Sequence, residues 1–309
     1  MKNKQTDTPP PSPNLVSPDM EENIEDDLEY YEDLSDNDLE EVEVEGAAET
    51  SVLCCQLEPT AGVLAVTGGV DDIGYVWSTQ TGEIVLKCTG HNDTVVDVGF
   101  SYDGTYVATG DMGGTVRVWK IANKSLVWEG NVDNLEWLQW HHGANVLMCG
   151  TFSGLIYMWR IPGGNIKVLP SRKRAAAGYE DGSLKVFDLK SGAVLHSFPK
   201  GEPHNDDLLC MDCHPGNNLL ITGDVDGLAV ERHKLNLDTG ITRLTWDKTN
   251  PLVYAGKLDG CVVVYDARSG SVERQILGHS DAIMDLSLSR VSNILLTTSD
   301  DSTARVFAI

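Results

Sequence analysis

The chain has 309 residues and a formal net charge of −24, and its first 50 residues hold 17 acidic against 2 basic side chains. This excess of carboxylates would repel phosphates, so it argues against binding to nucleic acid or to an anionic membrane and favours a basic protein partner. No apolar run is long enough to span a membrane, no signal-peptide core is present and the seven cysteines are scattered. We therefore expect a cytoplasmic protein with reduced thiols, present also in the nucleus or at the cell cortex.

Residues 1–40 have the composition of a disordered acidic tail, in which PPPSP is followed by an acidic run with scattered apolar residues. Two interpretations stay open. The tail could simply keep the protein soluble, or it could bind a partner through its apolar residues while its carboxylates steer the approach, tuned by phosphorylation of Ser35. The next residues, EVEVE at 41–45, alternate like a β-strand. We therefore predict one folded domain over residues 41–309.

Residues 90–120, GHNDTVVDVGFSYDGTYVATGDMGGTVRVWK, are the one complete copy of a unit that recurs from about residue 50 to the end of the chain. Short stretches alternate apolar with polar or small residues, and the pairs Asp103-Gly104 and Gly113-Gly114 separate them as turns, which predicts four strands. The opening Gly-His and the closing Val-Arg-Val-Trp are typical of a WD repeat. The unit therefore resembles one blade of a β-propeller.

The spacing of the unit can be checked inside the sequence. Three histidines lie 22 residues before a turn residue, namely His91 before Gly113, His204 before Asp226 and His279 before Asp301. The spacing predicts a buried hydrogen-bond network that ties each loop to a strand turn, held less firmly in the second repeat because Gly113 stands at the aspartate position. The closing tryptophans are 42 and 40 residues apart. The predicted structural network comprises His204, Asp226, His279, Asp301, Asp71, Asp181, Asp259, Trp77, Trp119 and Trp159.

The third repeat opens with NLEWLQW in place of Gly-His, and its Trp137 and Trp140 should lie on opposite faces of a strand, one in the core and the other exposed. Two later repeats are abbreviated. The interval from Trp159 to Phe187 is 28 residues, about one strand and turn short, and the stretch ERHKLNLDTG lacks the expected closing aromatic and outer strand.

The final repeat stops one strand short of a full blade, so we predict that residues near 41–47 supply its outer strand. The predicted fold class is all-β: a WD-repeat β-propeller of seven or eight blades, two of them abbreviated.

Three motifs suggest chemistry but are better explained by structure. His279, Ser299 and Asp301 could be taken for a hydrolase triad, yet in this repeat the same residue types form a buried network. Cys210-Met-Asp-Cys213-His214 matches a haem-attachment pattern and half of a zinc site, but in a strand its two thiols point to opposite faces. The basic residues at 172–174 suit a solvated turn. We therefore expect no catalytic residue, metal or cofactor.

Several strings are closer to one family than a general WD repeat requires. LAVTGGVDDIGYVW, VATGDMGGTVRVW, NLEWLQWH and AAAGYEDGSLKVFDLKSG together resemble the family of the angio-associated migratory cell protein, which consists of acidic-tailed WD-repeat proteins of eukaryotes. The resemblance implies a non-enzymatic, monomeric scaffold. In fungal relatives this scaffold escorts a new large-subunit ribosomal protein during ribosome assembly. In animal members it is associated with cell migration and angiogenesis, so a signalling scaffold at the cell cortex is the alternative.

An acidic rim is the predicted binding site for a Lys/Arg-rich partner. Residues just before each turn aspartate, and residues that open each inner strand, should line one rim of the propeller, where like charges reinforce one another's field. The alternative is that they are ordinary solvated carboxylates. The predicted rim residues are Asp93, Glu136, Glu180, Asp207, Asp281 and Asp300.

Overall fold

The computed structural model describes residues 41–43, 50–153, 156–164, 174–178, 182–188, 193–199, 204, 208–213, 220–224, 227–230, 233–236, 239–247, 249–289 and 291–309. Apart from one short 3₁₀ turn at Ile121–Asn123, the regular structure in these residues consists of β-strands, as predicted. The predicted tail at residues 1–40, with Ser35, lies outside the described residues, and so does most of the basic cluster at 172–174.

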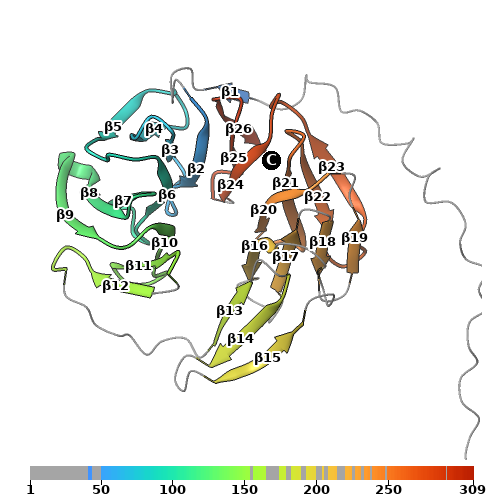
Figure 1. Ribbon diagram of the computed structural model, residues 1–309. Helices are drawn as coiled ribbons and strands as arrows, with labels where there is room; N and C mark the ends of the chain where they lie inside the picture. The colour runs from blue at the N-terminus through green and yellow to red at the C-terminus, as the bar shows by residue number, and fades with distance from the viewer. Residues whose placement is uncertain are drawn as a thin grey trace, which may run out of the picture. The chain divides into compact units, whose positions relative to one another are not determined.

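The described strands form seven antiparallel sheets, five with four strands and two with three. In each sheet the strands are neighbours in the order in which the chain makes them, except that β1 joins the last sheet (Figure 1). The first two sheets contain β2 (Val52–Leu57), β3 (Leu64–Gly69), β4 (Gly74–Ser78), β5 (Ile84–Cys88), β6 (Val95–Phe100), β7 (Tyr106–Asp111), β8 (Thr115–Lys120) and β9 (Ser125–Asn131).

The next two sheets are the three-stranded ones. They contain β10 (Leu135–Trp140), β11 (Val146–Thr151), β12 (Ile156–Arg160), β13 (Arg174–Gly178), β14 (Leu184–Asp188) and β15 (Val194–Phe198). The interval from Trp159 to Phe187, which the sequence identified as abbreviated, runs from β12 of one of these sheets to β14 of the other.

The remaining three sheets have four strands each. They contain β16 (Leu208–Cys213), β17 (Leu220–Asp224), β18 (Gly227–Val230), β19 (His233–Asn236), β20 (Ile241–Trp246), β21 (Leu252–Lys257), β22 (Val262–Asp266), β23 (Val272–Ile276), β24 (Ile283–Ser289), β25 (Ile294–Ser299), β26 (Ala304–Ala308) and β1 (Glu41–Glu43).

The prediction that ERHKLNLDTG lacks an outer strand is wrong. Its middle residues form β19, which pairs with β18 in a regular antiparallel register that places Leu235 opposite Leu228. A strand pairs through its backbone, so the absence of a closing aromatic does not prevent the ladder from forming. The number of blades in the whole propeller stays a prediction.

The predicted closing strand is present at residues 41–43. β1 pairs antiparallel with β26, with Val42 opposite Val306 and Glu43 opposite Arg305. The last sheet therefore combines three strands from the end of the chain with one from residues far ahead of them. This pairing covers an edge of β26 that would otherwise offer unpaired backbone groups to another chain.

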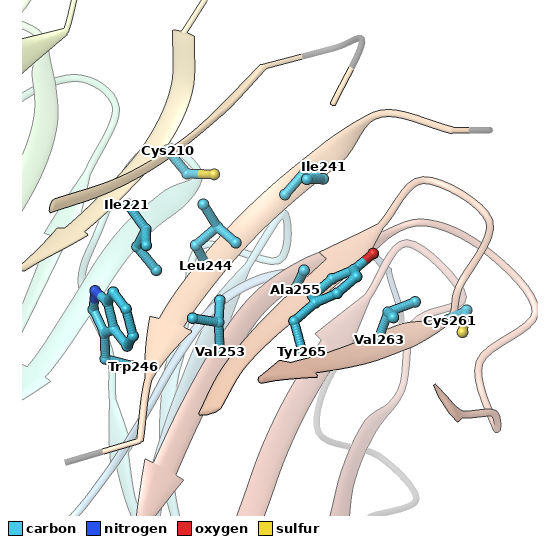
Figure 2. Packing of buried hydrophobic residues seen from close by; sticks show 10 residues of the cluster. All are labelled: Cys210, Ile221, Ile241, Leu244, Trp246, Val253, Ala255, Cys261, Val263 and Tyr265. Atoms are coloured by element: carbon cyan, nitrogen blue, oxygen red, sulfur yellow. The ribbon is translucent and has the colours of Figure 1, made fainter. Parts of the chain in front are cut away.

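Apolar residues of neighbouring sheets meet in shared cores. Figure 2 shows one such core, where Cys210 and Ile221 of β16 and β17 lie beside Leu244 and Trp246 of β20. The three predicted closing tryptophans are buried in the same way, each in a core shared with the preceding sheet: Trp77 with Leu296, Trp119 with Val76, and Trp159 with Val118. In these three sheets the closing tryptophan is thus buried between two neighbouring sheets.

The first strands of adjoining sheets are tied side by side. Donors on one first strand bond to acceptors on the preceding first strand, and residues further along one strand bond to residues further along the other, so the strands run in the same direction. Each donor and acceptor pair is as follows: Cys55 N with Asp285 Oδ2, Leu57 N with Ser287 Oγ, Leu138 N with Asp97 Oδ2, and Trp140 Nε1 with Gly99 O. The three backbone donors among them, on Cys55, Leu57 and Leu138, are edge N–H groups that a sheet would otherwise leave unpaired.

Candidate partner-binding rim

The histidine before β6 is held by two buried hydrogen bonds. His91 Nδ1 lies 3.0 Å from Asp111 Oδ2, and its Nε2 lies 2.7 Å from Thr109 Oγ1. Burial lowers the pKa of His91 against the pull of Asp111, so the neutral ring donates to the carboxylate and accepts from the hydroxyl. Asp111 also accepts from the N–H of Thr115 at 2.7 Å. The prediction that Gly113 deprives this histidine of its aspartate is therefore wrong, because Asp111 takes that role.

The histidine at position 204 is likewise bonded to an aspartate and a threonine of its own sheet. Its Nδ1 is hydrogen-bonded to Asp224, and its Nε2 lies 2.7 Å from Thr222 Oγ1. Asp224 is the last residue of β17 and corresponds to Asp111 at the end of β7. The predicted pairing of His204 with Asp226 is thus wrong, and Asp226 itself lies outside the described residues.

The histidine at position 279 follows the predicted spacing. Its Nδ1 lies 2.8 Å from Asp301 Oδ2, and its Nε2 lies 2.7 Å from Thr297 Oγ1. Burial alone would raise the pKa of Asp301, but hydrogen bonds from Thr303, His279 and the N–H of residue 280 together hold it at about 2. Ser299 Oγ donates to the backbone oxygen of residue 281 at 2.9 Å. Since His279 is bonded to Thr297 and Asp301, Ser299 is not placed as the nucleophile of a triad.

Two other predicted network residues stabilise turns. Asp71 accepts from the N–H of Ile73 and, at 2.8 Å, from the hydroxyl of Tyr75. Asp259 accepts from the N–H of Cys261 and is paired with Lys257 at 2.7 Å. The equivalent Asp181 lies outside the described residues.

Four of the six predicted rim residues are described, and all four are exposed. Asp93 and Asp281 lie just before β6 and β24, and each accepts from the N–H of the next residue at 2.8 Å. Glu136 is the second residue of β10, and Asp300 directly follows β25. Glu180 and Asp207 lie outside the described residues.

These four carboxylates lie at corresponding ends of their sheets. In each sheet the first strand begins opposite the end of the second, as the pairs Val95 with Asp111, Leu135 with Thr151 and Ile283 with Ser299 show. We use the name acidic rim for Asp93, Glu136, Asp281 and Asp300. Chemically, these four exposed carboxylates can attract cationic groups.

Charged side chains on the first strands form a cluster that the sequence reasoning did not identify. Arg243 Nε lies 3.2 Å from Asp285 Oδ1, and Asp97 accepts from the N–H of Leu138 at 2.6 Å. Burial raises the pKa of Asp97 to about 7 and also raises the pKa of Asp285, although Arg243 favours both charged forms. A signal was present, since Asp97 and Asp285 each lie six residues after a repeat histidine.

The motif with Cys210 gives no metal centre among the described residues. Cys210 is buried in the apolar core, and burial raises its thiol pKa to about 12. No group of three or more His, Cys, Asp or Glu side chains in the described part of the chain could hold a metal ion. In the same residues, no helix has the length and apolar character needed to cross a bilayer.

The repeat pattern matches a known family model. The WD domain, G-beta repeat model matches residues 82–120, 192–230 and 270–307. Each match begins with the outer strand of one sheet and ends with the third strand of the next. One sequence repeat therefore joins two neighbouring sheets.

Three related proteins extend the comparison. The angio-associated migratory cell protein of Homo sapiens is 33% identical over 337 residues, which cover 84% of this chain and 78% of the human protein. The protein of the same name from Canis lupus familiaris gives the same identity and coverage. An uncharacterised WD repeat-containing protein of Schizosaccharomyces pombe is 38% identical over 78 residues, covering 25% of this chain and 20% of the yeast protein.

The alignment with the human protein spans 337 residues, more than the 309 of this chain, so the relative contains residues that have no counterpart here. Despite these differences, the identity extends along most of both proteins. The chain therefore belongs to the WD-repeat family, together with the angio-associated migratory cell protein.

Proposed function

We propose that this protein is a non-enzymatic scaffold that escorts a basic segment of another protein, and that the acidic rim holds that segment. WD-repeat proteins act as protein-interaction scaffolds. The observation that carries the finer proposal is the exposure of Asp93, Glu136, Asp281 and Asp300 at corresponding ends of three sheets. Like charges that converge on one surface raise the local concentration of cationic groups and speed their association.

A large-subunit ribosomal protein is the partner that we propose first. Ribosomal proteins carry Lys/Arg-rich segments that bind RNA phosphates, and before assembly such segments need an anionic surface that keeps them from other polyanions. The net charge of −24 suits that task. The protein would hold the segment in the cytoplasm or nucleus until RNA replaces it.

Charge reversal on the rim tests the proposal. Glu136→Lys combined with Asp300→Lys should weaken a Lys/Arg-rich ribosomal peptide at least about tenfold in calorimetric titration, because both side chains are exposed and their carboxylates would face the cationic segment directly. Glu83→Lys with Glu273→Lys is the matched control, since these exposed carboxylates lie in a different turn and on an outer strand.

The control variant should bind like the wild-type protein, and added salt should weaken the wild-type complex steadily. Equal affinity for the rim variant and the control would show that the peptide binds elsewhere.

A second candidate function is a signalling scaffold, because the related human protein is named for cell migration. The two functions require different partners. Affinity purification from cells at moderate salt should enrich ribosomal proteins if the protein is an escort. Recovery of membrane or cytoskeletal proteins without ribosomal proteins would favour the signalling scaffold.

A further inference from the structure

Large apolar side chains lie exposed beside the acidic rim. In four sheets the residue that follows the second strand is apolar and exposed. Its N–H donates to the backbone oxygen of the residue immediately before the first strand. These four residues are Val70, Met112, Phe152 and Leu258. Phe152 is 74% exposed, more than any other large apolar side chain that the structure describes. The side chains therefore occupy equivalent places rather than scattered ones.

Two of these residues and a tryptophan lie on two adjoining sheets. The turn after Met112 is joined to the segment that precedes β10 by a backbone hydrogen bond of 2.9 Å from Val132 N to Gly114 O. The same segment is joined to Phe152 by a hydrogen bond of 2.9 Å from the N–H of Phe152 to Asn134 O. The segment at residues 132–134 is thus bonded both to the turn that carries Met112 and to Phe152.

Trp137 is a further exposed apolar side chain of the second of these sheets, but it lies on the face of β10 away from β7 and β8, because Leu135, Leu138 and Trp140 of the same strand pack against those two strands. The exposed fraction of Trp137 is 38%, while Trp140 on the opposite face of β10 is buried, as the alternation predicted. Its indole lies against Gly150, where an added Cβ would come within 2.1 Å of Nε1. The lack of a side chain at Gly150 therefore leaves room for the indole against the strand. We use the name apolar strip for Met112 and Phe152, which occupy equivalent turns of two adjoining sheets.

The charges beside the strip are acidic. Asp93, Asp133 and Glu136 are exposed, and residues 112–114, 132–137 and 150–153 contain no lysine or arginine. Asp93 Oδ2 would lie 3.6 Å from a Cβ at Gly113, so this carboxylate lies beside the turn that carries Met112. The N-terminal segment of this chain, with 17 acidic residues in the first 50, is a poor occupant because its charge has the same sign.

We propose that the apolar strip binds one large apolar side chain of the basic segment that the acidic rim attracts. This inference rests on the proposed function and narrows it, since the partner is then recognised by an aliphatic or aromatic anchor flanked by lysine and arginine, not by charge alone. The carboxylates speed the encounter and lose influence as salt rises. The strip retains the bound segment, because burial of apolar area is not screened by salt.

The test compares two peptides and two protein variants. One peptide is Lys/Arg-rich with a single central leucine, and the other has serine in its place. Phe152→Ser should weaken the leucine peptide at least about fivefold at both low and high salt, and should leave the serine peptide unchanged. Val291→Ser is the matched control, because Val291 is 70% exposed in the turn between β24 and β25, at the end of the sheet away from the rim. It should change neither affinity.

Each alternative result has a definite meaning. Equal affinities of Phe152→Ser and wild type for the leucine peptide would overturn the anchor, while rim-dependent binding of the serine peptide would leave the proposed function standing. Failure of both peptides to bind the wild-type protein would overturn both. Sedimentation without peptide tests whether a second copy of this chain occupies the strip. If Phe152→Ser converts a dimer into a monomer, the strip binds a second copy and the anchor proposal fails.

Discussion

At the scale of single residues, each described repeat histidine is fixed by a carboxylate and a threonine hydroxyl, and only the position of the carboxylate varies. Asp111 and Asp224 end the second strand of their sheets, whereas Ser299 stands at that position in the last sheet and Asp301, two residues further, takes the role. A constant spacing of 22 residues therefore identified one partner correctly and missed two.

Asp111→Ala should destabilise the protein by about 1–3 kcal/mol, because it leaves the buried ring of His91 and the N–H of Thr115 without their acceptor. Urea unfolding measures the change. Asp93→Ala, an exposed carboxylate two residues from the histidine, is the control and should change the free energy of unfolding by about 0.5 kcal/mol or less. A silent Asp111→Ala would refute the network.

Asp97 should make stability fall as pH rises through its titration range. Burial, with a smaller effect of Asp285, raises the pKa of Asp97 to about 7 in the folded protein, against about 3.9 in an unfolded chain. Between these values the folded chain keeps a proton that the unfolded chain has lost, so the free energy of unfolding decreases with pH. Asp97→Asn can still accept from the N–H of Leu138 but cannot titrate. The variant should gain stability relative to wild type between pH values of about 4 and 7.

Unfolding midpoints across that pH range measure the effect. Asp301→Asn provides a comparison of opposite sign, because the pKa of Asp301 is held at about 2. Its carboxylate contributes stability above the unfolded pKa, and that contribution is lost as pH falls towards about 2. The Asp301→Asn variant should therefore be weakest relative to wild type above about pH 4. A difference between Asp97→Asn and wild type that does not vary with pH would contradict the raised pKa.

At the scale of strands, pairing depends on what lies alongside as much as on local pattern. β19 forms without an aromatic residue because β18 offers it a matching ladder. β1 is only three residues long and pairs with β26 at the other end of the described chain. Such a strand cannot be stable by itself, so its formation depends on the completed sheet.

Removal of residues 1–49 should lower the melting temperature clearly more than removal of residues 1–40. Only the longer deletion takes away the strand Glu41–Glu43. Its loss exposes the backbone edge of β26 at Arg305, Val306 and Phe307, which pair with that strand in the intact protein. Thermal unfolding followed by circular dichroism distinguishes the two proteins, and the longer deletion should also aggregate sooner. Identical melting curves would show that β1 contributes nothing to the sheet.

At the scale of the whole molecule, charge and family membership agree on a binding protein. The first 50 residues carry 17 acidic side chains, and the exposed rim residues of three sheets add to the same sign. The alignment with the human relative spans more residues than this chain possesses, and the shortened interval in the sequence runs from one three-stranded sheet to the other. Of the rim residues, Asp93, Asp281 and Asp300 belong to four-stranded sheets, and Glu136 belongs to the three-stranded sheet β10–β12.

The sequence by itself determined the features that repeat locally. Period-two alternation, turn glycines and the Gly-His opening predicted the strands and the WD-repeat family, and strand alternation predicted that Trp137 and Trp140 differ in burial. Only the tertiary structure decided which carboxylate holds His91 and His204, that β19 completes its sheet, and that Asp97, Arg243 and Asp285 share one cluster. The physical reason is that local pattern fixes which face of a strand a side chain occupies, whereas its partner comes from a neighbouring strand or sheet whose register is set by packing and by backbone hydrogen bonds across the whole fold.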